Sequence, residues 1–195
     1  EKFWPASATL GVTAHSSPPL NIRDQVRGLL RYPYGCAEQT VSSAWPHVII
    51  DDAYAKELGL KPYSRAERVA MVDAAIGCLA GMQGAQGGMT LWGGGEYEHW
   101  ITAYVAGFLI DARESGFTVP EAFGRKMQDW MLKEFQLAPS QMPRLPAPQT
   151  GAQPGQLDLV RGAHARFANA AHLGYVLARE QRAPLATLRL LHDEH

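Results

Sequence analysis

The residues that could do chemistry lie together at positions 35–39, where a glycine is followed by Cys36, Ala37, Glu38 and Gln39. A Pro/Gly turn precedes Cys36 and a helical pattern follows it, so Cys36 is expected at a helix start. Unpaired backbone N–H groups and the helix dipole favour a thiolate there. Gln39 lies about one helical turn further on, within reach of the sulfur. A thiolate held against a carboxamide, away from water, can displace ammonia and form an internal thioester that amines or hydroxyls can attack.

Taken alone, the Cys-x-x-Gln pattern favours a simpler interpretation, a buried cysteine beside an ordinary helix start. The rest of the chain indicates no second chemistry. Glycines between residues 84 and 95 lack the Gly-Lys-Ser/Thr ending of a phosphate-binding loop, and the stretch 192–195 is not a His-Glu-x-x-His metal motif. The acids Glu96, Glu98 and Asp111 form no convincing glycosidase pair. Cys78 is expected to be a buried, inert thiol within a helix.

Composition narrows the class of protein. The chain has 195 residues, 46% of them hydrophobic, and 18 basic against 19 acidic residues give a formal net charge of −1. That balance argues against a nucleic-acid-binding surface. Apolar stretches end well short of the roughly 18 residues of a membrane span. Two cysteines are too few for a disulfide scaffold, and no signal-peptide pattern opens the chain, so we expect a mature or excised segment.

The elements expected to position Cys36 are helical. The first 19 residues lack a helical period and are interpreted as an extended segment, the last strand of a neighbouring domain. A helix is expected from the N-cap Asn21 to the turn before Gly35, and another over 36–44. Pro46 is expected to open the next segment. Ser64 with a glutamate three residues on is a capping-box signature for a helix to about residue 82.

The C-terminal half is expected to continue as helices, over 97–114, 120–136, 157–181 and from Pro184 to the end, with a proline-rich loop over 138–156. The segment 109–114 is echoed by 175–180, and each closes a long helix before a proline. Repeated helical hairpins of this kind are typical of solenoids and closed α/α toroids. The sequence therefore predicts an all-α fold.

The segment around Cys36 resembles a known family. Gly35-Cys36-Ala37-Glu38-Gln39 is similar to the Gly-Cys-x-Glu-Gln thioester motif of the alpha-2-macroglobulin and complement family. Two further segments, Tyr32-Pro33-Tyr34 and Pro18-Pro19-Leu20-Asn21, resemble the bacterial branch of that family. Pro46 stands where the family has a proline. Further likeness lies in Gln86-Gly87-Gly88, Leu91-Trp92 and Trp100-Ile101-Thr102-Ala103-Tyr104-Val105. The resemblance covers residues 18–195.

The resemblance implies the N-terminal part of a thioester domain, an α/α toroid that is incomplete in this chain. Residues 1–17 are then an extended segment from a neighbouring β-domain, and residues 18–195 belong to the thioester domain. It further implies a single-use protease inhibitor rather than a turnover enzyme. After a protease cleaves a bait region, the thioester captures lysine amines of that protease. Bacterial members are periplasmic and lipid-anchored, which sets the expected location of the full-length protein. No cofactor, metal or nucleic acid is expected, and neighbouring domains of the same protein are expected partners.

The resemblance also assigns roles. Cys36 is the expected thioester sulfur and Gln39 the acyl donor, Glu38 is expected to orient the turn, and Gly35 to allow a backbone shape that a side chain would block. Five aromatic residues are candidate shields that keep water off the bond: Tyr32, Tyr34, Trp92, Trp100 and Tyr104. Each is equally explained as core packing, which the helical spacing favours for Trp100 and Tyr104.

One departure from the family concerns a later histidine that complement members use to transfer the acyl group to hydroxyls. The corresponding region, 138–156, contains no histidine, and His164 just beyond it has no certain alignment. His47, His99 and His172 are interpreted as surface or core residues. Direct aminolysis, with a preference for amines over hydroxyls, is therefore expected. Two alternatives stay open: an interaction module without a live thioester, and an enzyme with Cys36 as nucleophile and a histidine base.

Overall fold

The computed structural model describes residues 35–141 and 154–194, and these fold into helices joined by loops. In chain order the helices are α2 (Ala37–Ile49), α3 (Asp52–Glu57), α4 (Arg65–Ala80), α5 (His99–Glu114), α6 (Glu121–Gln141), α7 (Pro154–Arg179) and α8 (Leu185–Glu194). Within the described residues, β pairing is limited to one isolated bridge between Gln83 and Met89, so the all-α prediction is confirmed. The predicted extended segment 1–17, the predicted helix from Asn21, and Tyr32 and Tyr34 lie outside the described residues.

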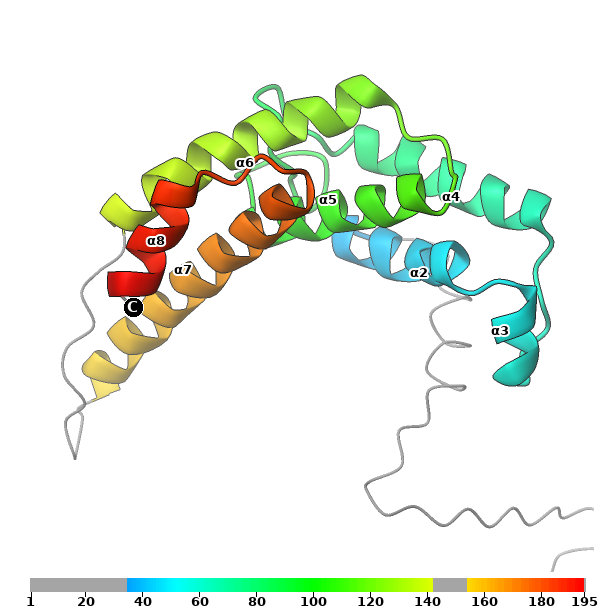
Figure 1. Cartoon of the computed structure of the whole chain (residues 1–195), viewed down its shortest axis with the longest axis horizontal. Coiled ribbons are helices and arrows are strands. Elements are labelled where there is room, and N and C mark those ends of the chain that lie inside the picture. Colours follow the sequence, from blue (N-terminus) through cyan, green and yellow to red (C-terminus); the bar gives the residue numbers. More distant parts are fainter. Residues whose placement is uncertain (1–34, 142–153, 195) are drawn as a thin grey trace, which may run out of the picture.

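The helices form an arch with α2, α5 and α7 along its inner side and α4 and α6 along its outer side (Figure 1). Two hydrogen bonds join α2 to α5, one between Ser42 and Tyr104 and one between Trp45 and Asp111. The later residue of α2 bonds to the later residue of α5, so the two helices run in the same direction. Arg68 near the start of α4 reaches His47 near the end of α2, so the outer helix runs the opposite way. This alternation of an inner and an outer layer is the arrangement found in α/α toroids.

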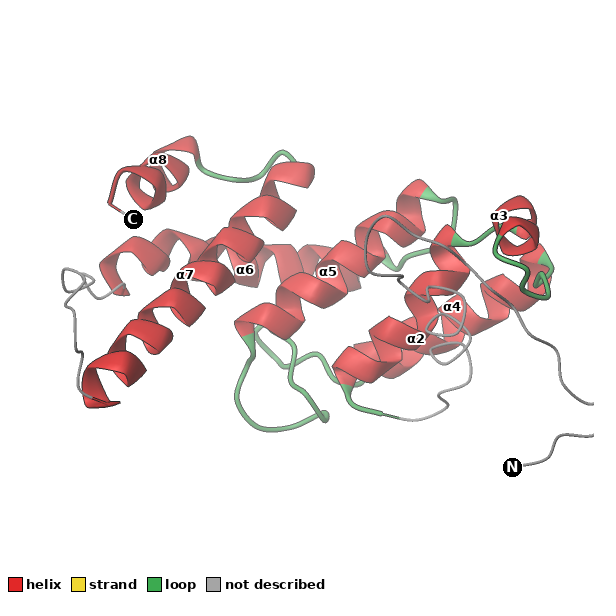
Figure 2. Ribbon diagram, turned by 90° about the horizontal axis from the view of Figure 1, so that it is seen from below, coloured by secondary structure: helices red, strands yellow, loops and turns green. Residues whose placement is uncertain are grey.

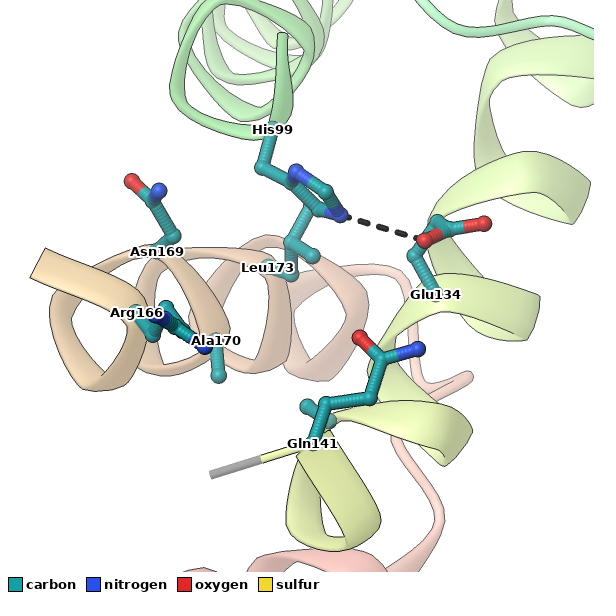
Figure 3. A pocket seen from close by; sticks show the side chains of 8 residues that line it. His99, Glu134, Gln141, Arg166, Asn169, Ala170 and Leu173 are labelled. Atoms are coloured by element: carbon teal, nitrogen blue, oxygen red, sulfur yellow. Dashed lines mark hydrogen bonds and ion pairs between the residues drawn. The ribbon is translucent and has the colours of Figure 1, made fainter. Parts of the chain in front are cut away.

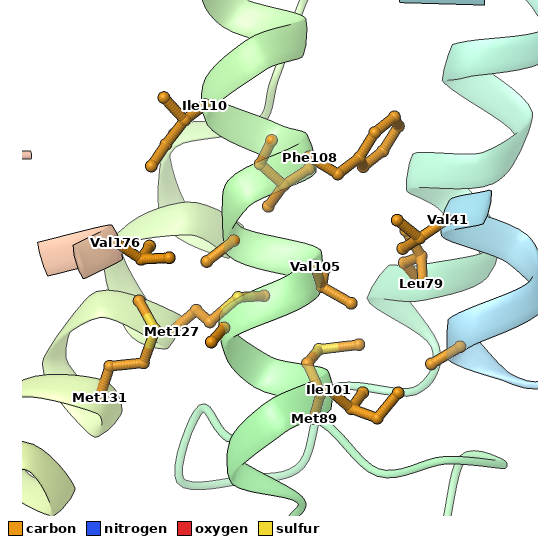
Figure 4. Packing of buried hydrophobic residues seen from close by; sticks show 14 of the residues in the cluster. Val41, Leu79, Met89, Ile101, Val105, Phe108, Ile110, Met127, Met131 and Val176 are labelled. Atoms are coloured by element: carbon orange, nitrogen blue, oxygen red, sulfur yellow. The ribbon is translucent and has the colours of Figure 1, made fainter. Parts of the chain in front are cut away.

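Helix α5 is the centre of the packing. All residues from Ile101 to Ile110 are buried except Tyr104, which is half-buried. One side of α5 meets Val41 of α2 and Leu79 of α4, and the other meets residues of α6 and α7 such as Met127 (Figure 4). Full burial of an apolar side chain of this size contributes about 1.5–3 kcal/mol. A helix buried all round therefore fixes the helices on either side of it.

The echoed segments face one another across α5 and α7. Arg113 pairs with Glu180, and Arg179 pairs reciprocally with Glu114 at 2.7 Å. Because both helices end at these residues, the ion pairs also show that α5 and α7 run in the same direction. The repeated sequence thus marks two equivalent helix ends of the inner layer.

Three expectations about local structure are wrong. Pro46 does not open a new segment but lies inside α2, which continues to Ile49 because His47 and Val48 are buried and hold the last turn in place. The predicted loop 138–156 is shorter, since α6 runs through Pro139 to Gln141 and α7 begins at Pro154. Cys78 is exposed on α4 and not buried, because the buried stripe of that helix passes through Ile76 and Leu79 instead.

Candidate functional site

Cys36 and Gln39 contact each other at the start of α2. Cys36 is the N-cap residue, with an extended backbone and a side chain that is 6% exposed. The carboxamide oxygen Oε1 of Gln39 accepts a hydrogen bond from the Cys36 N–H at 3.2 Å. The Cys36 side chain faces the backbone N–H of Gln39 in return, as in a capping box. The thiol and the carboxamide are thus folded towards each other, with Cys36 buried and Gln39 half-buried.

Gly35 makes room for this contact. A Cβ atom at position 35 would stand 2.8 Å from Cδ of Gln39, and closer still to its Oε1 and Cβ atoms. Real Cβ atoms do not approach neighbours so closely, and the overlap falls on the carboxamide that meets Cys36. The reason for glycine at this position is therefore the space of the Gln39 side chain.

The start of α2 is also held by the loop between α4 and α5, residues 81–98. The carbonyl of Leu91 accepts the Ala37 N–H at 2.9 Å, which satisfies one of the free N–H groups of the first turn. The loop is fixed in turn by Thr102 of α5, whose Oγ1 accepts the N–H of the fully buried Met89 at 2.9 Å. Figure 2 shows the loop, in green, beside the start of α5. Two distant motifs, one before α2 and one in α5, therefore meet through this loop.

Glu38 points along α2 towards α5. Its Oε1 accepts a hydrogen bond from Oγ of Ser42 at 3.0 Å, and the same Oγ lies 3.0 Å from the hydroxyl of Tyr104. The ring of Tyr104 packs on Trp45 with ring centroids 5.0 Å apart. Ser42 was missed in the sequence analysis, although its position four residues after Glu38 places it on the same helix face. The chain of three polar groups ties the first turn of α2 to α5.

The candidate shielding residues occupy different environments. Trp92 directly follows Leu91, the residue that anchors Ala37, and its side chain is 67% exposed. Trp100 is 41% exposed, so the expectation that it packs in the core is wrong: it lies in the first turn of α5, outside the buried stretch from Ile101. Tyr104 is half-buried against the core, as its spacing suggests. A shielding role for these residues stays a prediction.

None of the described histidines is hydrogen-bonded to Cys36. His47 lies at the other end of α2 and is 5% exposed, and burial, together with the positive charge of Arg68, lowers its pKa below 6.5. His99 pairs with Glu134, His164 is exposed on α7, and burial lowers the pKa of the half-buried His172.

Among residues 35–141 and 154–194, no group of His, Cys, Asp and Glu side chains is arranged to hold a metal ion. The helices of that same part of the chain include none with the length and hydropathy of a membrane span. The geometry that stands out is therefore the Cys36–Gln39 contact and its supports.

Comparison with known proteins gives consistent results. The family model of the A-macroglobulin TED domain matches residues 7–140. Alpha-2-macroglobulin from Xylella fastidiosa (strain Temecula1) is 33% identical over 202 residues, which cover 98% of this chain and 11% of that protein. Alpha-2-macroglobulin from Escherichia coli K12 is 34% identical over 193 residues, covering 97% of this chain and 11% of that protein. The chain thus spans about a tenth of the length of these relatives.

Solved structures of bacterial alpha-2-macroglobulins are similar as well. Native Escherichia coli alpha-2-macroglobulin, from domain MG7 to the C-terminus, has a TM-score of 0.73 and 36% identity, covering 90% of this chain and 26% of that one. Salmonella alpha-2-macroglobulin reacted with methylamine has a TM-score of 0.73 and 35% identity, with coverages of 91% and 11%. The trypsin-activated Escherichia coli protein has a TM-score of 0.68 and 34% identity, with coverages of 90% and 11%. The predicted toroid architecture is confirmed by this likeness.

Proposed function

The chain belongs to the A-macroglobulin TED domain family, and from that premise we propose that Cys36 and Gln39 form an internal thioester that captures amines. The observation that carries the proposal is the reciprocal contact between these two residues at the start of α2. In forming the bond, Sγ of Cys36 attacks Cδ of Gln39. The sulfur proton and the carboxamide nitrogen leave together as ammonia, and the side chains stay joined as a thioester.

Capture of an amine breaks the thioester and returns Gln39 to an amide, with the captured amine in the place of the lost ammonia. The nitrogen of a lysine side chain forms a bond to Cδ of Gln39, the C–S bond breaks, and the electron pair leaves on Sγ. The proton lost by the amine is balanced by the one that the thiolate takes up. The product is an amide link between Gln39 and the captured protein, together with a free Cys36 thiol. Each domain reacts once, so the proposed activity is trapping and not turnover.

The surroundings of the pair support this chemistry. Gly35 leaves the space for the Gln39 carboxamide, and the Leu91 carbonyl and the Glu38–Ser42–Tyr104 chain fix the first turn of α2. A fixed contact between reacting groups lowers the entropic part of the barrier to bond formation. Low exposure of Cys36 also limits hydrolysis of the bond.

We place this chemistry in a bacterial protease inhibitor. Its relatives include alpha-2-macroglobulins activated by trypsin and by porcine elastase, so proteases are the proposed targets and lysine amines the proposed point of attachment. Other domains of the same protein are the proposed neighbours of this one. By likeness to bacterial members of the family, the proposed location is the periplasmic face of the inner membrane, with a lipid anchor in the full-length protein.

Intact mass with and without methylamine tests the thioester. We expect a protein lighter than its sequence by one ammonia, which gains one methylamine and frees the thiol of Cys36. Gln39→Glu should lack both changes. Cys78→Ser is the matched control, because it removes the other cysteine, which is exposed and far from the pair in the sequence, and should keep both changes. An unchanged mass in the full-length protein would refute the thioester and favour an interaction module.

A further inference from the structure

A cavity of about 60 Å³ opens between α5, α6 and α7 (Figure 3). His99, the first residue of α5, lies on its wall, and α2 and α5 begin at the same rim of the arch because they run in the same direction. The cavity therefore lies on the rim that carries Cys36, separated from it by α5. Its apolar lining consists of Ala138, Ala170 and Leu173, and the small side chains of the two alanines leave the space of the cavity open.

One charged pair in the wall is already satisfied internally. Oε2 of Glu134 lies 3.1 Å from Nε2 of His99, and the His99 ring packs on Trp130 with ring centroids 5.2 Å apart. The Glu134 carboxylate is only 19% exposed. This pair closes one side of the cavity and has its main interaction within the protein.

The uncommitted groups are on the other walls. Arg166 and Asn169 of α7 and Gln141 at the end of α6 line the cavity, and Figure 3 shows Gln141 across the hollow from the α7 residues. Within the part of the chain that the structure describes, no hydrogen bond or ion pair engages any of these three side chains. The unpaired charge at the cavity is therefore positive, and the two amides can donate beside it.

We propose that this cavity binds an acidic side chain, glutamate in particular, of a protein that docks at the rim. A cavity needs at least roughly 10–15 Å³ to hold one water molecule, so about 60 Å³ leaves room for a larger group, such as a carboxylate with a short aliphatic stem. The stem would lie on the alanines and Leu173, and the carboxylate would accept hydrogen bonds from Arg166 and Asn169. A lysine side chain is disfavoured, since Arg166 repels it and Glu134 is engaged by His99. The site does not depend on the Cys36–Gln39 bond.

The test uses small peptide mimics on the isotope-labelled 195-residue chain, followed by NMR. N-acetyl-glutamate N-methylamide should shift the side-chain amide signals of Asn169 and Gln141. Its uncharged glutamine counterpart should bind at least about tenfold more weakly, since charge-assisted hydrogen bonds are roughly twice as strong as neutral ones. Arg166→Gln should abolish the shifts and Arg166→Lys should retain part of them. Arg189→Gln, an exposed change on α8, is the matched control and should leave them unchanged.

Other results would overturn the proposal. Equal binding of the glutamine mimic, or tighter binding of the lysine mimic, would contradict recognition of a carboxylate. Acetate binding as tightly as the glutamate mimic would show that the stem contributes nothing, and so would unchanged binding after Ala138→Leu, which fills the hollow from its half-buried edge. Arg166 lies on the surface of α7, so its variants test the site even if Ala138→Leu perturbs the fold.

Discussion

At the scale of single residues, the Cys36–Gln39 contact depends on the absence of a side chain at position 35. The family motif names four residues that could each be explained as ordinary helix-start chemistry. The structure separates their contributions: Gly35 provides space, Glu38 extends to Ser42, and the other two face each other. A substitution at each of these residues should therefore affect formation of the thioester through the particular contact that the residue makes.

Gly35→Ala is expected to reduce formation of the thioester about a hundredfold or more, because a displacement of the order of an ångström between reacting groups costs that much. The added methyl overlaps the Gln39 side chain and pushes its carboxamide away from Cys36. The measurement is the fraction of chains that incorporate methylamine, by intact mass. Gly94→Ala, where a Cβ would meet nothing within 4 Å, is the matched control. Normal labelling of Gly35→Ala would show that the space is not needed.

The absence of a histidine bonded to Cys36 among the described residues leads to a second expectation at this scale. An amine attacks a thioester without a base that activates it, whereas a hydroxyl needs one. Methylamine should therefore be incorporated while glycerol is not, at equal concentration and over a range of pH. Comparable coupling of glycerol would show that a base such as His164 reaches the bond in the full-length protein, and His164→Ala would then remove the coupling.

At the scale of helices, the far end of α2 is held by two basic residues. His47 is 5% exposed with its ring edge-on to Tyr63, and Nη1 of Arg68 donates to the His47 carbonyl at 3.3 Å. A cation at the C-terminal end of a helix interacts favourably with the helix dipole. A protonated His47 would place a second positive charge beside Arg68, with no carboxylate paired to either group among the described residues. The anchor of α2 thus requires neutral His47.

Stability is expected to fall as the pH is lowered through 6.5 and below. The folded-state pKa of His47 lies below its ordinary value of 6.5, because of burial and Arg68, so the unfolded chain takes up the proton first. The contribution is fully present above pH 6.5 and is lost as the pH falls towards the folded pKa. Urea unfolding between pH 5 and 8 measures it. His47→Gln should flatten the slope partly and His47→Gln with His172→Gln further, since His172 is shifted the same way.

The sequence predicted helices best where the signal is local. The Ser64–Glu67 capping box opens α4 as expected, since both its hydrogen bonds lie within four residues of chain. Predictions from the sequence were wrong where burial of neighbouring residues determines the local structure. Pro46 normally disfavours a helix interior by about 3 kcal/mol, yet packing of its neighbours carries α2 past it. Trp100 has helical spacing but stands one residue outside the buried stretch of α5. The hydrogen bond between Ala37 at the start of α2 and Leu91 in the loop before α5 could not be predicted from the sequence of either segment alone.

At the scale of the whole molecule, one acidic side chain contacts both neighbours of its helix in the inner layer. Asp111 of α5 accepts the Trp45 Nε1–H of α2 at 2.8 Å through Oδ2 and pairs with Nη1 of Arg179 of α7 at 2.7 Å through Oδ1. The hydrogen bond that Arg179 donates to Asp111 raises the pKa of Arg179. Asp111 therefore connects α2, which begins beside Cys36, directly to α7 in the far part of the arch.

Asp111→Ala is expected to destabilise the chain by about 1–3 kcal/mol, because it leaves the Trp45 N–H without its acceptor and removes one of the two carboxylates that pair with the partly buried Arg179. Asp129→Ala is the matched control: it breaks the Asp129–Arg182 pair, in which the aspartate is 60% exposed, and should cost less than about 1 kcal/mol. Urea unfolding gives both values. Since Trp45 packs on Tyr104, which reaches Glu38 through Ser42, Asp111→Ala should also slow methylamine incorporation, whereas Asp129→Ala should not. Equal costs for the two variants would show that Asp111 adds nothing to the apolar packing and the other polar contacts of the three inner helices, and that the start of α2 does not depend on it.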